Sequence, residues 1–217
     1  MGAEAIIFDL DGTLIDTLDD IADSANCALR ANGFPTHPTE AFRLYVGEGV
    51  ETLFERALPA GKSDTATIAA CVKSYQARYK DRWHIQSKPY PGIPELLDEL
   101  SEMQLPIAVF SNKPDGFTKQ CINRFFPGCR FSIVLGHRNG TPLKPHPSGA
   151  YYIASEIGVP PANTLFLGDS GVDMKTARAS GMTPIGALWG FRSKEELLES
   201  GAKAVIDHPS ESLQWID

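Results

Sequence analysis

The segment Ala5-Ile6-Ile7-Phe8-Asp9-Leu10-Asp11-Gly12-Thr13 decides the fold of this chain. Its first four residues form an apolar run of the length of a buried strand, and two carboxylates follow directly. In open α/β sheets, ligands bind at the edge formed by the carboxyl ends of the strands. Taken alone, Asp9-Leu10-Asp11-Gly12 is equally compatible with a simple turn, because Asp and Gly are common turn residues. Its meaning therefore depends on the rest of the chain.

Apolar runs of strand length recur and alternate with amphipathic stretches of helical length. Strands are expected at 5–8, 107–110, 133–135 and 165–167, with weaker ones at 183–188 and 204–206, and helices at 93–103, 116–125, 148–157, 172–180 and 194–199. Such alternation is typical of a parallel sheet with helices on both faces. The sequence predicts an α/β fold, a doubly wound Rossmann-like parallel sheet.

The stretch from about Thr17 to Trp83 differs, because it has helical periodicity and helix caps but no convincing strand. A first helix is expected to start at Thr17 and to stop at Asn32-Gly33, and another to cover Ala66 to Trp83. We therefore expect residues 1–15 and 89–217 to form the α/β core domain, and residues 16–88 to form an inserted all-helical domain.

The bulk composition excludes several classes of protein. The 217 residues are 42% hydrophobic and 22% charged, which is close to the globular average. The net charge of −7 opposes binding to nucleic acid. The four cysteines (Cys27, Cys71, Cys121, Cys129) lack the spacing of a zinc site or a disulfide framework, so buried free thiols are expected.

The N-terminus resembles neither a signal peptide nor a membrane span, so a cytoplasmic protein without membrane contact is expected.

Polar groups suited to phosphoryl transfer follow three later strands. They are Ser111-Asn112, Lys144, and the pair Asp169 and Asp173. Each has an ordinary structural reading as a helix cap, a solvated lysine or a turn residue. All of them fall at the same predicted edge of the sheet as Asp9. The occurrence of all these residues in one chain, each after a successive strand, favours a shared site.

This ordered set resembles the haloacid dehalogenase superfamily, with Asp9-Leu10-Asp11-Gly12-Thr13 as its first motif. The phosphoglycolate phosphatase-like branch is the closest pattern. Support for that branch comes from five segments: Ile15-Asp16-Thr17-Leu18, Val46-Gly47-Glu48-Gly49, Ser111-Asn112-Lys113, Lys144-Pro145-His146-Pro147 and Gly168-Asp169-Ser170. The inserted helical domain is similar to the cap of this family.

The resemblance implies catalytic roles for three residues. Asp9 is expected to attack phosphorus and to form an aspartyl-phosphate. Asp11 is expected to protonate the leaving oxygen and then to activate water. Lys144 is expected to neutralise the nucleophile and the phosphoryl group.

The resemblance also implies a metal. Clustered carboxylates repel one another, and oxygen ligands without His or Cys suit Mg²⁺. In the family pattern Asp9 and Asp169 bind it directly, the backbone carbonyl of Asp11 adds an oxygen, and Asp173 supports it from nearby.

Contacts to the substrate are expected from two parts of the chain. Ser111 and Asn112 would hold phosphate oxygens in a loop that leads into a helix, and Thr13 would shape the first loop. Arg43, Gly47 and Gly49 lie in a stretch that resembles the substrate loop of the branch, although a plain turn between helices is equally compatible. His146 is the histidine closest in sequence to Lys144; the remaining histidines are expected to be structural.

The expected function is that of a Mg²⁺-dependent phosphatase acting on a small phosphorylated metabolite, with 2-phosphoglycolate as the best candidate. A beta-phosphoglucomutase-like phosphosugar mutase and a pyrophosphatase remain open alternatives, as does a non-catalytic protein that binds a phosphorylated ligand. The sequence leaves open whether the protein is a monomer or a homodimer.

Overall fold

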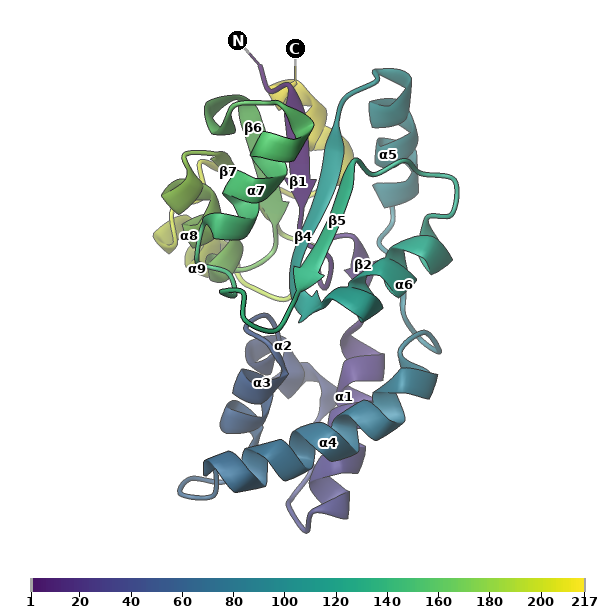
Figure 1. Ribbon diagram of the computed structural model, residues 1–217, viewed down its shortest axis with the longest axis vertical. Coiled ribbons are helices and arrows are strands. Elements are labelled where there is room, and N and C mark those ends of the chain that lie inside the picture. The colour runs from purple at the N-terminus through teal and green to yellow at the C-terminus, as the bar shows by residue number, and fades with distance from the viewer. Residues whose placement is uncertain (1, 217) are drawn as a thin grey trace. The chain divides into compact units, whose positions relative to one another are not determined.

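The computed structural model describes residues 2–216, and its centre is a six-stranded parallel sheet (Figure 1). The strand order is β5-β4-β1-β6-β7-β8. The strands are β1 (Ala5–Phe8), β4 (Ile107–Pro114), β5 (Ile133–His137), β6 (Thr164–Gly168), β7 (Thr183–Ala187) and β8 (Ala204–Ile206). The chain order reverses on the two sides of β1, which makes the sheet doubly wound. The predicted fold class is confirmed.

Helices cover both faces of this sheet, which explains why every residue of the central strand β1 is apolar and buried. They are α5 (Ile93–Glu102), α6 (Asp115–Phe125), α7 (Ser148–Ile157), α8 (Gly171–Ser180) and α9 (Lys194–Glu199). Side chains of α7 and α8 share one buried cluster with Ile7, Ala108 and Phe166 of the sheet. In Figure 1, α5 and α6 lie on the other side of the strands.

The strand β4 is longer than expected. It was predicted to end at Phe110, but it runs to Pro114, and α6 begins at the next residue. Its pairing with β5 is irregular between Phe110 and Pro114, where it resumes opposite His137. The prediction of a loop at Ser111 and Asn112 was wrong, because this irregular pairing keeps polar residues in an extended conformation. Their side chains are therefore positioned by a strand.

The chain divides into two compact units, one formed by the residues up to Ile15 together with those from Pro89 onward, and the other by Asp16–Lys88. The second unit contains α1 (Leu18–Ala31), α2 (Phe42–Tyr45), α3 (Val50–Ala57) and α4 (Thr65–Arg82). Short strands β2 (Ile15–Asp16) and β3 (Lys88–Pro89) pair with each other where the chain passes between the units. The helices α2 and α3 were not predicted, because their turns are short.

Asp20 is a buried carboxylate inside the helical unit. It is 2% exposed. It accepts hydrogen bonds from the backbone N–H groups of Gln86 and Ser87 and from the Ser87 hydroxyl, at 2.7–3.1 Å. These contacts join the start of α1 to the segment that follows α4, so the two ends of the unit are tied together.

The four cysteines are free, and Cys71 and Cys121 are buried. The prediction of free thiols is confirmed, but the predicted burial holds only for these two, because Cys27 and Cys129 are partly exposed. Among the helices that the structure describes, none has the length and apolar character that crossing a membrane requires.

Candidate active site

Asp9 lies at the carboxyl end of β1, in the middle of the sheet. Its backbone N–H donates to the Leu167 carbonyl of β6 at 2.9 Å, so strand pairing continues up to this residue. The side chain is 6% exposed, and its Oδ1 accepts a hydrogen bond from the Leu10 N–H at 2.6 Å. The backbone of Asp9 is therefore fixed by pairing with β6, and its carboxylate is fixed by the turn that follows β1.

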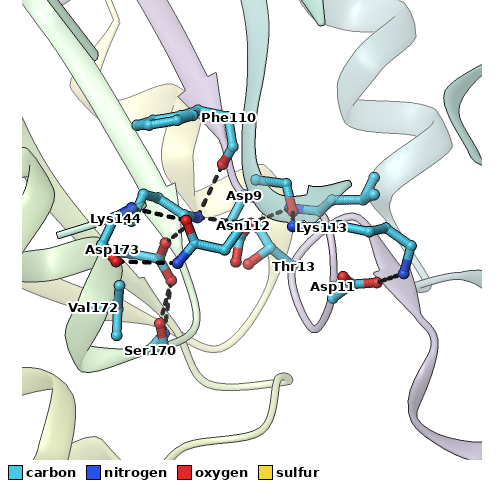
Figure 2. Close-up of polar contacts among 12 residues, drawn as sticks. Asp9, Asp11, Thr13, Phe110, Asn112, Lys113, Lys144, Ser170, Val172 and Asp173 are labelled. Atoms are coloured by element: carbon cyan, nitrogen blue, oxygen red, sulfur yellow. Dashed lines mark hydrogen bonds and ion pairs between the residues drawn. The ribbon is translucent and has the colours of Figure 1, made fainter. Parts of the chain in front are cut away.

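Lys144 is the centre of the buried polar contacts (Figure 2). Its Nζ lies 2.8 Å from Asp9 Oδ1 and 2.7 Å from Asp173 Oδ1, and it donates to the Phe110 carbonyl at 2.9 Å. An ammonium has three N–H donors, and these three acceptors match them. The long route of the chain from β5 to α7 therefore delivers one fully buried cation to the end of β1.

Asp173 is fixed by its own helix. It forms a capping box at the start of α8, where its Oδ2 accepts from the Ser170 N–H at 3.1 Å and from the Ser170 hydroxyl at 2.6 Å. The other oxygen faces Lys144. Asp173 is fully buried, so it acts on the site as a fixed negative charge beside the lysine.

Asp169 is clamped between two segments of backbone. Its Oδ1 accepts from the Thr13 hydroxyl at 3.2 Å, and its Oδ2 accepts from the Phe191 N–H at 2.8 Å. A Cβ atom at Gly12 or at Gly190 would overlap the Asp169 side chain. Glycine is therefore required at both positions, because the backbone must approach the carboxylate closely. Thr13, expected to shape the first loop, also orients Asp169.

Three buried carboxylates converge in this cluster, which consists of Asp9, Asp169 and Asp173. One oxygen of each lies within 4.8 Å of the others. Burial raises the pKa of Asp9 from 3.8 to about 7, and the Asp173 charge adds to this rise while Lys144 opposes it. Burial raises the pKa of Asp169 well above its ordinary value too, and the charges of Asp173 and Asp9 contribute.

Lys144 remains charged in these surroundings. Burial alone would lower its pKa, but the carboxylates of Asp173 and Asp9 outweigh that effect and raise the pKa above its ordinary value. One ammonium cannot balance three carboxylates. The all-oxygen donor set and the excess negative charge fit a hard cation such as Mg²⁺.

Asn112 contacts Lys144 through both ends of its side-chain amide. Its Nδ2 donates to the Lys144 carbonyl at 3.1 Å, and its Oδ1 accepts from the Lys144 N–H at 2.8 Å. These contacts hold the lysine segment against β4, and the expected contact of Asn112 with phosphate stays a prediction. Ser111 is buried beside it, with its Oγ accepting from the Lys113 N–H at 3.2 Å.

Comparison with known proteins identifies the family. The model of the haloacid dehalogenase-like hydrolases matches residues 6–187. The chain belongs to this family. The resemblance stated from the motifs is confirmed, and the chain is a hydrolase of the haloacid dehalogenase type.

Relatives of this hydrolase include phosphoglycolate phosphatases. That of Mannheimia succiniciproducens is 34% identical over 199 residues, covering 89% of each chain. That of Haemophilus influenzae is 32% identical over 206 residues, covering 92% of each. A solved structure from Lactobacillus delbrueckii subsp. bulgaricus has a TM-score of 0.93 and 27% identity, covering 100% of this chain and 99% of that one.

One residue of the hydrolase site was missed. Lys113 Nζ lies 2.8 Å from Asp11 Oδ1, and both side chains are largely buried. The segment Ser111-Asn112-Lys113 was noted as a motif, but no role was given to its lysine. The signal that would have found it is the continuation of β4, which places Lys113 on the same side of the strand as Ser111.

The contacts of two residues in the segment after β7 were also missed. Phe191 N–H holds Asp169, and the Trp189 indole N–H donates to the Thr13 carbonyl at 2.9 Å. No local pattern in the sequence indicates these contacts, because the segment after β7 meets Thr13 and Asp169 only in the folded chain.

Arg43, Gly47 and Gly49 belong to the helical unit and not to the carboxylate cluster. Arg43 in α2 pairs with Glu40 at 2.6 Å, and the two glycines lie between α2 and α3 with positive φ angles. Their role in substrate binding stays a prediction. His146 lies outside the cluster as well, with its Nδ1 3.0 Å from the Ser148 hydroxyl at the start of α7.

A cavity of about 380 Å³ opens beside the end of β4. Ser111 and Asn112 border it, together with His137 and Arg138. Asp9, Asp11 and Lys144 are not among the residues that line it, although all of them are described. We locate the chemistry at the carboxylate cluster, since the convergent charged groups are there.

Proposed function

We propose that this hydrolase is a Mg²⁺-dependent phosphatase that releases phosphate from 2-phosphoglycolate through an aspartyl-phosphate on Asp9. The observation that carries the proposal is the buried Asp9 carboxylate at the end of β1, 2.8 Å from the Lys144 ammonium and two residues before Asp11. A nucleophile, a charge-neutralising cation and a second carboxylate suited to proton transfer are the minimum that this chemistry needs. The relatives named phosphoglycolate phosphatases support the substrate.

In the first step an Asp9 carboxylate oxygen attacks phosphorus. The bond between phosphorus and the leaving oxygen breaks, and Asp11 donates a proton to that oxygen, so that glycolate leaves. Lys144 stays paired with Asp9 and stabilises negative charge on the phosphoryl oxygens. Ser111 and the N–H groups at the end of β4 bind those oxygens.

In the second step Asp11 removes a proton from a water molecule. The water oxygen attacks phosphorus, and the bond to Asp9 breaks, which releases phosphate and restores the Asp9 carboxylate. Asp11 then carries the proton that it needs for the next cycle. Phosphate monoester hydrolysis is so slow without catalysis that enzymes accelerate it by up to about 10²¹-fold, so one effect alone is insufficient.

Mg²⁺ would be held by Asp9, Asp169 and the Asp11 carbonyl, with Asp173 nearby. When bound, it supplies positive charge to the transferring phosphoryl group and offsets the repulsion among the carboxylates. The clamp that Thr13 and Phe191 form on Asp169 orients that carboxylate before the metal arrives. A carboxylate fixed in advance loses little conformational entropy on binding.

We assign the helical unit, residues 16–88, to the role of a cap that excludes water and selects the substrate. Within it, Arg43, Gly47 and Gly49 are the residues that we expect to contact the substrate. The four free cysteines fit a reducing compartment such as the cytoplasm.

The test is phosphate release from a panel of 2-phosphoglycolate, pyrophosphate, hexose phosphates and nucleotides, with Mg²⁺ and with a chelator. We expect the highest kcat/KM for 2-phosphoglycolate and no turnover after complete chelation. Activity that survives chelation would remove the metal from the proposal.

The panel also separates the alternatives. A higher kcat/KM for pyrophosphate would identify a pyrophosphatase. Isomerisation of a sugar phosphate that depends on a bisphosphate primer would identify a mutase. Binding of phosphorylated ligands without turnover of any panel member would identify a non-catalytic protein.

A further inference from the structure

Lys113 is the buried cation that the proposed chemistry leaves without a task. It extends from the late part of β4, and its Nζ donates to Asp11 Oδ1 at 2.8 Å (Figure 2). Lys144 already serves Asp9 and Asp173. The site therefore holds two lysines with different partners, one facing the nucleophile and one facing the proposed acid and base.

The position of Lys113 relative to the leaving group follows from the task of Asp11. A group that protonates the leaving oxygen must come within roughly 2.6–3.2 Å of it. Because Lys113 Nζ is 2.8 Å from Oδ1 of the same carboxylate, it lies within roughly 6–8 Å of the leaving oxygen in the reacting complex, depending on which Asp11 oxygen donates the proton. The carboxylate carbon of 2-phosphoglycolate is two covalent bonds from that oxygen. The ammonium is therefore within reach of the substrate carboxylate.

An ammonium can hold two carboxylates at once, since it carries three N–H donors that rotate freely. Lys113 can thus keep Asp11 while it binds a second anion. In a buried setting the attraction between an ammonium and a carboxylate exceeds that in water. A substrate with a neutral group in the same place gains no such ion pair.

We propose that Lys113 is a specificity-determining residue that binds an anionic group attached next to the leaving oxygen of the substrate. This inference rests on the proposed function, because it uses the assignment of Asp11 to the leaving group. It adds the residue that causes the preference: Lys113 would favour phosphomonoesters whose leaving group carries a carboxylate close to the ester oxygen. The competing role for Lys113 is to hold Asp11 in position, which would affect every substrate equally.

The test compares 2-phosphoglycolate with 2-hydroxyethyl phosphate, in which a neutral hydroxymethyl group replaces the carboxylate. Lys113→Met removes the charge and keeps most of the volume, and Lys113→Arg keeps the charge. Lys119→Met is the matched control, because Lys119 forms an ion pair with Asp115 at the same 2.8 Å distance outside the site. kcat and KM are measured for all four proteins on both substrates.

For Lys113→Met we expect the ratio of kcat/KM for the two substrates to fall by about 10- to 100-fold, as for the loss of one hydrogen bond to a charged group. Lys113→Arg should keep most of the preference, and Lys119→Met all of it. Activity on 2-hydroxyethyl phosphate reports that each variant is folded. Equal losses on both substrates in Lys113→Met, including complete loss on both, would overturn the inference.

The two proposals fail in different ways. If the wild-type protein hydrolyses neither ester, the phosphatase proposal fails. If the wild-type protein hydrolyses both, and Lys113→Met changes them equally, only the role of Lys113 fails.

Discussion

Each of the two compact units contains a buried carboxylate, and the groups that contact this carboxylate differ between the units. Asp20 in the helical unit accepts hydrogen bonds from the Gln86 and Ser87 backbone and from the Ser87 hydroxyl. Asp9 in the core accepts one hydrogen bond from Leu10, shares Lys144 with Asp173, and lies near a third carboxylate. Asp20 has only donors among these partners, whereas Asp9 lies beside two other carboxylates and shares one ammonium with Asp173.

This difference in surroundings distinguishes a buried carboxylate with a structural role from one with a functional role. A buried charge that is fully hydrogen-bonded stabilises the fold. A cluster of like charges destabilises the protein alone and becomes favourable only when a cation or a phosphoryl group arrives. Four changes test whether the two kinds of site differ in this way.

Asp9→Asn should have the largest effect on activity. The amide cannot attack phosphorus, so kcat should fall on the order of 10⁴-fold or more, as for other catalytic nucleophiles. The fold should persist, because one of the crowded negative charges is removed. Steady-state phosphate release and a thermal melt check both points, and substantial residual turnover would exclude Asp9 as the nucleophile.

Lys144→Met should have the largest effect on stability. It leaves Asp9 and Asp173 buried without their ammonium, which should lower the free energy of unfolding by about 3–5 kcal/mol in the presence of a chelator. Denaturant titration measures the loss. Lys119→Met removes an exposed ion pair and should cost about 1 kcal/mol or less. Similar losses in the two variants would contradict the comparison.

The metal-free protein should lose stability as the pH rises. The pKa of Asp9 is about 7 in the folded protein and 3.8 as an ordinary carboxyl, so the folded state holds its proton more tightly. The resulting stabilisation is complete below about pH 3.8 and is lost as the pH rises through about 7.

Between pH 5 and pH 8 the contribution of Asp9 to this loss should amount to about 2–3 kcal/mol, and Asp9→Asn should keep only the contribution of Asp169. Denaturant titrations of both proteins with chelator provide the measurement. Parallel pH dependence in the two proteins would show that the Asp9 carboxylate is not strained by its surroundings.

Apart from the control Lys119→Met, Asp20→Asn should have the smallest effect. The amide presents donors to the N–H groups of Gln86 and Ser87, so the free energy of unfolding should fall by about 2 kcal/mol, as for the loss of hydrogen bonds to a charged group. kcat measured well below the melting temperature should change little. A loss of activity like that of Asp9→Asn would show that this carboxylate also serves the chemistry.

Much of the core could be predicted because its strands are buried on both faces. The strand Ala5–Phe8 is apolar throughout, Thr164–Gly168 is buried throughout with an apolar centre, and the helices between such strands show a 3.6-residue period. The end of β4 could not be predicted, because its polar residues lie between two points of pairing with β5, at Phe110 and at Pro114. The short helices α2 and α3 have too few turns for a clear period.

The same limit applies to the site. Asp9, Lys144 and Asp173 were found because each follows a recognisable strand or lies in a motif. The contacts of Asp169 with Phe191 and of Asn112 with Lys144 join residues 22 and 32 positions apart. No local pattern indicates which of several polar side chains will meet after the chain has folded.

The sequence by itself determined the order of strands and helices, the family, and the acidic and basic residues from which the site is built. These depend on local periodicity and on motifs, which are properties of neighbouring residues. Only the tertiary structure decided that Asn112 holds the lysine segment and that Lys113 pairs with Asp11. The physical reason is that both contacts depend on the extended end of β4, whose conformation is stabilised by pairing with a distant strand.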